Sequence, residues 1–496
     1  MSDAIVLNPD LVGLFARASS DHNPLHTSVE YARATAFGRP VSHGALAVLA
    51  VLGRLPMAVS PSRVHAVFRD AVYPDAPHHL TVAANEDGYR GDLWAHGQRV
   101  LTASVQSGVA PPPASNWPSP PDAPSPMRQA PRALTLDEIE EGMEFSGWYT
   151  PAHLDELAFR LGLDRAVLPV ATAMCWASYL AGMEVPGRQG LLASLTVTAH
   201  EHRPVPRYRY LCKVTSVDRR FGAVRVQGRL WADQRPAAEV RLETFFRPSA
   251  RVVGLSETRA ALPAGGALRG RVAVVIGASR GLGAATTLAL AEQGCTVVGV
   301  HHMSTARAAE LGRHRRIEMH QGDASDSGFC HTLAKHVRET YGRTDFLVCS
   351  AGPVLRPTRL TAETTELITG HVTAAMRLVA IPVAAFSPLL DASSGTLLVV
   401  SSQVLDNPGP EWPHHAAAKA ALEHLVRAQC PAHPDWRVLL ARLPSLDTDL
   451  STPLTVLQRE RRASPAAAAA TLVTALHTPR APGCALLEFD ESGALR

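Results

Sequence analysis

The chain has 496 residues, of which 46% are hydrophobic and 19% are charged, and its 48 basic and 45 acidic residues give a net charge of +3. This composition excludes a disordered or fibrous chain. The nearly equal numbers of basic and acidic residues do not indicate a nucleic-acid partner, which would need an excess of positive charge. At roughly 100–200 residues per domain, the length predicts about three domains. The seven scattered cysteines form no CxxC pair, so we expect neither a disulfide framework nor a metal site.

The N-terminal residues, MSDAIVLNPDLVG, include two aspartates and no basic stretch, so no signal peptide is expected. The longest apolar runs, around residues 44–53 and 466–476, are shorter than the roughly 18 residues that a membrane span needs. We therefore expect a cytoplasmic protein without a membrane partner.

Breaks in composition predict the domain organisation. A proline-rich stretch predicts an extended linker at residues 109–134, and a Gly/Ala-rich stretch predicts a second linker at residues 251–267. The predicted domains are residues 1–108, 135–250 and 268–496.

The first two domains share a rough internal similarity. Each has an Ala/Leu-rich helical run, at residues 45–55 and 171–183, followed by a strand, a proline-containing break and a new strand. The pattern predicts a duplicated α+β unit.

The third domain alternates short β-branched runs with helical stretches. A strand is predicted at residues 272–276 and a helix at 282–293, and further strands are predicted at residues 297–300, 346–349, 396–401 and 438–442. This alternation is typical of an α/β Rossmann-type, doubly wound parallel sheet.

Candidate catalytic residues lie in the stretch ASSDHNPLHTSVEYARATAFGRPVSHG. Asp21 and His26 flank Asn23-Pro24, and Pro24 predicts a fixed turn rather than a helix. Two titratable side chains on one rigid turn can hold a water molecule and exchange protons with it. His43-Gly44 then precedes an apolar helix, where a free backbone N–H can stabilise an enolate oxygen.

This string resembles the MaoC-like, (R)-specific enoyl-thioester hydratases of the hot-dog fold. It matches their pattern at Asp21, Asn23, Pro24, Leu25, His26, Ala32, Phe37, Gly38, Pro40, Val41, His43 and Gly44, with Ser20 in place of the usual glycine. The resemblance implies that Asp21 and His26 are catalytic, that Asn23 orients them, and that the Gly44 amide polarises the thioester. The alternative is that Asp21 caps a helix and His26 fills a core position.

The second domain lacks this motif. Its equivalent stretch, residues 158–183, has Asp164 but no Asn-Pro, no following histidine and no His-Gly. The resemblance implies an α+β double hot-dog, in which residues 135–250 form a degenerate half that supports the structure and binds substrate.

A glycine-rich loop opens the third domain. In RVAVVIGASRGLG, Gly277, Gly281 and Gly283 follow a strand and open a helix, which lets a pyrophosphate reach the helix N-terminus. With the later strand ends, this loop resembles the short-chain dehydrogenase/reductase family. The resemblance implies cofactor binding by the following residues: Gly277, Ser279, Arg280, Gly281, Leu282, Gly283, His301, Asp323, Ser350, Ala351, Gly352, Lys419 and Thr448.

The sequence favours NADPH over NADH. Arg280 lies inside the glycine-rich loop, and the second strand ends in Gly-Val-His-His at residues 299–302, with no acid to bind a ribose 2′-hydroxyl. Arg280 would attract the 2′-phosphate of NADPH, and no carboxylate is present there to repel it.

The catalytic residues of the third domain differ from the usual set of this family at two positions. Ser402 and Lys419 occupy their expected places, but His415 stands at the tyrosine position and His371 at the asparagine position. A neighbouring Lys⁺ disfavours a charged imidazole, and a neutral imidazole is a poor proton donor. The domain is therefore either an active reductase or a vestigial scaffold.

These observations predict a bifunctional enzyme. Its hydro-lyase part would dehydrate (R)-3-hydroxyacyl thioesters, or hydrate 2-enoyl thioesters, and its NADPH-dependent part would reduce 3-ketoacyl thioesters, as in fatty-acid or polyketide processing. The acyl group would arrive on a separate carrier protein or on CoA, and the reductase resemblance implies a homodimer. The alternatives are a dehydratase with an impaired reductase domain, an acyl-chain isomerase or cyclase, and a non-catalytic docking scaffold.

Overall fold

The computed structural model describes residues 4–56, 61–108, 110–112, 117–120, 122–200, 205–247, 253–262, 266–303, 305–451, 462–479 and 481–495. The chain divides into two compact units, of which the first holds most of the residues up to 247 and the second holds most of those from 253 onward.

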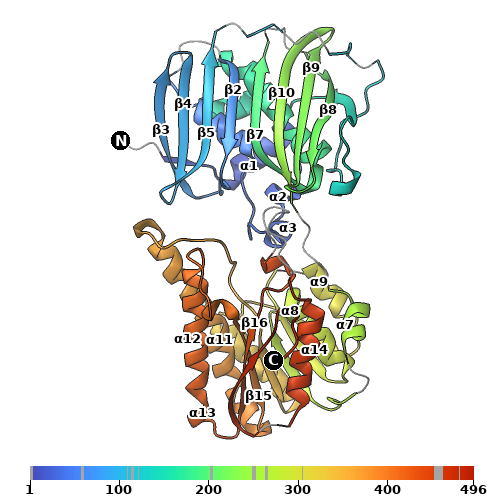
Figure 1. Cartoon of the computed structure of the whole chain (residues 1–496), viewed down its shortest axis with the longest axis vertical. Coiled ribbons are helices and arrows are strands. Elements are labelled where there is room, and N and C mark those ends of the chain that lie inside the picture. The colour runs from blue at the N-terminus through green and yellow to red at the C-terminus, as the bar shows by residue number, and fades with distance from the viewer. Residues whose placement is uncertain are drawn as a thin grey trace. The chain divides into compact units, whose positions relative to one another are not determined.

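The first unit is built on a ten-stranded antiparallel sheet with the strand order β1-β3-β4-β5-β2-β7-β10-β9-β8-β6. Figure 1 shows eight of these strands, from β3 to β8, side by side. The bounds are β1 Ala4–Val6, β2 Pro61–Phe68, β3 Pro77–Asn85, β4 Gly88–Ala95, β5 Gln98–Ser107, β6 Glu144–Tyr149, β7 Gly190–Ala199, β8 Tyr208–Asp218, β9 Ala223–Ala232 and β10 Arg235–Phe246.

The strand order repeats about the centre of this sheet. Reading outward from the central β2–β7 pair, one half runs β2-β5-β4-β3-β1 and the other runs β7-β10-β9-β8-β6. The central pair is antiparallel, with Ala66 opposite Leu195. The first unit is therefore two copies of one α+β arrangement joined edge to edge, as the internal similarity of the sequence predicts.

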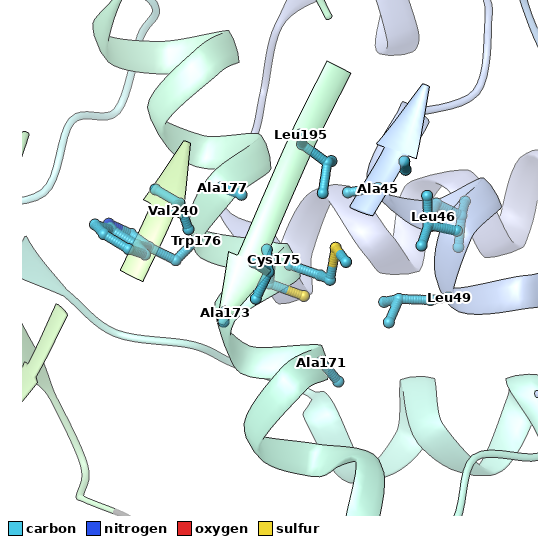
Figure 2. Packing of buried hydrophobic residues seen from close by; sticks show 14 of the residues in the cluster. Ala45, Leu46, Leu49, Ala171, Ala173, Cys175, Trp176, Ala177, Leu195 and Val240 are labelled. Carbon is cyan, nitrogen blue, oxygen red and sulfur yellow. The ribbon is translucent and has the colours of Figure 1, made fainter. Parts of the chain in front are cut away.

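Each copy contributes one almost entirely apolar helix to a shared core. Every residue from Ala45 to Leu52 of α4 is buried, and so is every residue from Val170 to Tyr179 of α6. Figure 2 shows Leu46 and Leu49 of α4 near Ala173 and Cys175 of α6. A helix that is apolar all round has to be enclosed, so these two helices form the centre of the unit.

The first unit also contains α1, whose apolar face is buried, and three shorter helices. Their bounds, with those of the two central helices, are α1 Pro9–Ser19, α2 Pro24–Thr27, α3 Val29–Arg33, α4 Gly44–Leu52, α5 Leu154–Leu161 and α6 Leu168–Tyr179.

The described part of the proline-rich segment lies along the second copy. Ser125 forms a β-bridge with Gly147 of β6, and the Arg128 amide donates to the Tyr179 hydroxyl at 2.8 Å. This segment thus packs on the second copy, through α6 and β6, and connects it to the first copy along the chain.

The second unit contains a seven-stranded parallel sheet with the order β13-β12-β11-β14-β15-β16-β17. Helices cover both faces: apolar residues of α8 and α14 pack on one face, and those of α10, α11 and α12 pack on the other. This is the predicted Rossmann-type doubly wound arrangement, and the strand order reverses between β11 and β14, where such sheets bind ligands.

The strands of the second unit are β11 Val272–Ile276, β12 Thr296–His301, β13 Ile317–Gln321, β14 Phe346–Cys349, β15 Thr396–Ser402, β16 Arg437–Leu443 and β17 Gly483–Glu488. Its helices are α7 Leu255–Ala261, α8 Gly281–Glu292, α9 Thr305–Leu311, α10 Ser327–Tyr341, α11 Thr365–Ser393, α12 Pro413–Arg427, α13 Gln429–Ala432 and α14 Pro465–His477.

Two helical stretches among the described residues are long and apolar enough to cross a membrane by composition alone. They are Arg165–Glu184, which is 83% buried, and Ala362–Ser393, which is 39% buried. The first includes α6 and is the core helix described above, and core helices satisfy the same test.

Candidate active sites

The first candidate site begins where α1 ends. Ser20 follows the helix in the left-handed conformation, with a φ of 56°, and the next residue, Asp21, is only 2% exposed. Asp21 Oδ1 accepts a hydrogen bond from the Asn23 amide at 3.1 Å. Asn23 caps α2 and Pro24 is its first residue. The predicted non-helical turn at Pro24 is therefore wrong, because a helix tolerates proline at its first position, where the missing amide is not needed.

The Asn23 side chain fixes this turn. Its carboxamide oxygen accepts from the Leu25 amide at 3.0 Å, and its nitrogen donates to the Gly187 carbonyl at 3.1 Å. Asn23 thereby ties the turn that carries Asp21 to the second copy of the α+β arrangement.

The second copy also contributes directly to the site. The Ser178 hydroxyl, on α6, donates to Asp21 Oδ2 at 2.7 Å. One turn further on, a π-helical turn at Leu180–Glu184 brings Gly182 against the same carboxyl group, and a β-carbon at Gly182 would overlap Asp21 Oδ1. Neither residue was predicted from the sequence, because the second copy lacks the Asp/His motif. The sequence feature that could have pointed to them is the spacing of Ser178 and Gly182, four positions apart in an otherwise apolar stretch.

Two histidine rings complete the cluster. The His26 and His43 rings lie 3.8 Å apart between centroids. His26 Nδ1 is 2.8 Å from the Val41 carbonyl oxygen, which requires the hydrogen on Nδ1 and leaves the Nε2 lone pair available as a base. His43 Nε2 lies 3.1 Å from the Asp21 backbone oxygen and 3.9 Å from its Oδ2. The predicted catalytic pair is thus brought together, with His43 packed behind it.

Burial sets the protonation of this cluster. It raises the pKa of Asp21 above 3.8, against the opposing effects of His26 and Ser178. Burial, reinforced by His43, lowers the pKa of His26 to about 3, and burial lowers the pKa of His43 to about 3 as well. Burial thus favours the uncharged form of both groups, which leaves a neutral imidazole beside a carboxyl group that is easier to protonate than an exposed one.

Gly44 is the first residue of α4, and His43 is its N-cap. Amides in the first turn have no partner within a helix, so they can donate to a ligand. A β-carbon at Gly44 would lie 2.8 Å from Phe68 Cε1, so glycine is needed there for packing as well.

The second candidate site is the glycine-rich loop between β11 and α8. Gly277 has a φ of +86° and Gly281 a φ of +52°, and a β-carbon at Gly283 would overlap the Gly277 carbonyl oxygen. Ser279 and Leu282 are buried beside it. The loop is thus a tight turn that exposes the α8 N-terminus, which fits a dinucleotide pyrophosphate.

Arg280, the N-cap residue of α8, has a partner that the sequence did not indicate. Its guanidinium donates to Asp449 Oδ2 at 2.6 Å. The neighbouring Thr448 lies against the loop, since a β-carbon at Gly281 would be 3.3 Å from Thr448 Cβ. The structure therefore brings Thr448 and the glycine-rich loop together.

The other predicted cofactor residues lie at the carboxyl ends of the strands. His301 ends β12, is 7% exposed, and has an Nδ1 atom with no hydrogen-bond partner among the described residues. Asp323 follows β13 and accepts from the Ser325 amide at 2.8 Å. Ser350, Ala351 and Gly352 follow β14, and the Ser350 amide donates to the Ile276 carbonyl at 3.0 Å.

The reductase-like residues gather around α12. Lys419 and His415 lie one turn apart on this helix, and Ser402 ends β15. Lys419 Nζ donates to the Val400 carbonyl at 2.7 Å. Burial lowers the pKa of Lys419 to about 8, although Glu423 opposes this effect.

Three histidines surround this lysine. Burial and then Lys419 lower the pKa of His415 to about 3, and burial followed by His414 lowers that of His371 to about 4. The His371 and His414 rings meet edge to face at 4.5 Å. His414, which sequence reasoning passed over, is 1% exposed. The imidazole at the tyrosine position is therefore neutral, as the sequence predicts.

Known families match the two units separately. The MaoC like domain family matches residues 1–79, and the short chain dehydrogenase family matches residues 271–455.

Individual relatives match the second unit. A 2-dehydro-3-deoxy-D-gluconate 5-dehydrogenase of Pseudoalteromonas atlantica is 32% identical over 94 residues, so the match spans 18% of this chain and only 37% of that relative. An uncharacterized NAD-dependent oxidoreductase of Mycobacterium tuberculosis is 28% identical over 39% of this chain and 78% of its own length. The solved alcohol dehydrogenase of Thermococcus sibiricus, complexed with 5-hydroxy-NADP, is 26% identical over 45% of this chain and 97% of its own, with a TM-score of 0.41.

We predict that His26 and His43 remain neutral from pH 5 to 8, because the pKa of each is lowered to about 3. Histidine-selective NMR of the labelled chain tests this, with His26→Asn and His43→Asn variants to assign the two signals. Titration of either ring near the ordinary pKa of about 6.5 would contradict the electrostatics described here.

Proposed function

The chain joins an N-terminal MaoC-like domain to a C-terminal short-chain dehydrogenase domain, and from this premise we propose that it dehydrates (R)-3-hydroxyacyl thioesters and, in reverse, hydrates 2-enoyl thioesters. The observation that carries the proposal is the buried Asp21 carboxyl beside a neutral His26. Elimination of water requires a base at the α-carbon and an acid at the 3-hydroxyl, and these two groups provide both.

In the dehydration, His26 Nε2 removes the proton from the α-carbon, and the Gly44 amide stabilises the negative charge that develops on the thioester oxygen. The carbon–oxygen bond at C3 then breaks as the Asp21 carboxyl delivers its proton to the departing hydroxyl, which leaves as water. His26 and Asp21 exchange protons with solvent to return to their starting states. Hydration follows the same steps in reverse.

The same geometry supports a double hot-dog assignment for the first unit. Only the first copy carries the Asp/His pair, while the second copy supplies Ser178 and Gly182 to it. We therefore assign residues 135–250 a positioning and substrate-binding role rather than a second reaction.

The second unit has a cradle that suits a nicotinamide dinucleotide, which would supply or accept a hydride when bound. Gly277 to Gly283 would hold the pyrophosphate, and Asp323 lies where the adenine end is expected. The absence of an acid after His301 favours NADPH, and Arg280 adds to this if its guanidinium exchanges Asp449 for the 2′-phosphate. One relative is described as NAD-dependent.

Reduction of a 3-ketoacyl thioester would supply the hydroxyl that the first unit eliminates, so the two reactions are chemically consecutive. Ser402 and Lys419 are retained for this step, but the neutral His415 is a weak proton donor. A second candidate, favoured by that observation, is a dehydratase whose reductase domain binds cofactor with little turnover. The acyl group would be carried by CoA or a separate carrier protein, and we propose a homodimer in the cytoplasm.

For the dehydratase site, we predict that Asp21→Asn lowers kcat/KM by a factor on the order of 10²–10⁴, because it removes the acid. Ser178→Ala should cost about tenfold, since it removes one hydrogen bond to the carboxyl group. Because that bond holds the Asp21 pKa down, its loss should also move the alkaline limb of the dehydration profile to higher pH.

Thr172→Ala is the matched control, because Thr172 lies on the same helix but its hydroxyl donates to the Leu168 carbonyl. Enoyl-thioester formation measured across pH distinguishes the variants. Equal pH profiles for Ser178→Ala and Thr172→Ala would refute the positioning role of Ser178.

For the cofactor site, we predict that His301→Asp weakens NADPH binding at least tenfold and strengthens NADH binding, because a carboxylate repels the 2′-phosphate and accepts a ribose hydroxyl. Binding of both cofactors is measured on each folded variant. A proportionate loss of the two affinities would show that His301 does not set cofactor choice.

For the reductase site, we predict that His415→Tyr raises the rate of 3-ketoacyl thioester reduction about tenfold or more, because a phenol beside Lys419 is a better neutral acid than this imidazole. His424→Tyr, at an exposed position on the same helix, is the control. Single-turnover oxidation of NADPH is the measurement, and no gain over that control would favour the vestigial alternative.

A further inference from the structure

A cluster of two histidines and one glutamate lies on the second unit, outside both candidate sites. Glu318 and His320 belong to β13, the edge strand of the parallel sheet, and His336 belongs to α10. Their registered neighbours on β12, Val298 and Val300, face the apolar core under α10. The cluster therefore lies where the edge strand meets the helix that covers it.

The three side chains converge on one point. His320 Nε2 is 2.8 Å from Glu318 Oε1, and His336 Nε2 is 2.9 Å from the same oxygen. One ligand atom from each residue lies within 4.8 Å of the others. Tetrahedral Zn²⁺ with bonds of about 2.0–2.1 Å needs its ligand atoms roughly 3.3–3.4 Å apart. To reach that spacing, each imidazole nitrogen would move about 0.5 Å away from Glu318 Oε1.

The other carboxylate oxygen is already held. The Tyr341 hydroxyl, one and a half turns beyond His336 on α10, donates to Glu318 Oε2 at 2.6 Å. Outer hydrogen bonds of this kind orient the ligands of metal sites. Oε1 is thus left facing the two imidazole nitrogens.

The donor set selects the kind of ion. Two imidazole nitrogens and one carboxylate suit Zn²⁺ and similar first-row ions rather than Ca²⁺ or Mg²⁺, which prefer oxygen ligands. The side chains are 26–39% exposed, so a fourth position is open to water. We propose that Glu318, His320 and His336 form a Zn²⁺ site that clamps α10 to the edge of the sheet. This inference does not depend on the reactions proposed above.

The test is Zn²⁺ titration of the full chain by calorimetry after removal of metals with a chelator. The expected result is that His320→Asn and His336→Asn each lose one equivalent of bound Zn²⁺. His331→Asn is the control, because His331 lies on α10 but is exposed and bonds to the Ser327 carbonyl. It should bind as the wild type does.

Three further measurements test whether the binding is specific to this cluster. Ligand atoms of Asp21, His26 and His43 also lie within 4.8 Å of one another. The titrations are therefore repeated in a His26→Asn background, which disrupts that cluster and leaves the Glu318 cluster intact. Tyr341→Phe, which keeps the ring, should weaken Zn²⁺ binding about 10–100-fold. Zn²⁺ should raise the melting temperature of the wild type but not that of His336→Asn. Unchanged stoichiometry and melting behaviour in His320→Asn and His336→Asn would overturn the proposal.

Discussion

The first candidate site depends on one buried contact, between Asp21 and α6 with the turn that follows it. A carboxyl group with 2% exposure needs hydrogen-bond partners, because an unpaired buried polar group is costly. The Ser178 hydroxyl and the Asn23 amide meet this need, and Gly182 leaves room for it. The Ser178 hydroxyl and Gly182 both belong to the second copy, so a single copy would leave the carboxyl group without one of its two hydrogen bonds. The ten-stranded sheet is what keeps α6 in position beside the first copy's turn.

Desolvation acts on both units with different results. In the first unit it pushes the pKa of Asp21 up and that of His26 down, which creates an acid and a base in one site. In the second unit it lowers the pKa values of Lys419 and His415 together, so that a neutral imidazole stands at the proton-donating position. The same physical effect therefore equips one site for proton transfer and weakens proton delivery in the other.

Much of this arrangement was predictable from local sequence. The periodicity at residues 272–276 and the spacing from Gly277 to Gly283 predicted the strand and the phosphate cradle, since both depend on neighbouring residues. The contribution of Ser178 was not predictable, because it lies 157 positions from Asp21 and joins it only through the fold. The contact between Glu318 and His336 was not predicted either, because only the packing of α10 on β13 brings the two residues together. The Pro24 turn was misassigned because proline both ends helices and begins them.

The central claim is that the first unit eliminates water from a thioester of defined configuration. The most direct measurement is a pair of incubations of the purified chain with (R)- and (S)-3-hydroxyacyl thioesters, without nicotinamide cofactor, followed by mass spectrometry of the acyl group. The account predicts an enoyl product, 18 mass units lighter because one water is lost, from the (R) substrate alone. Recovery of both substrates unchanged from the folded protein would contradict it.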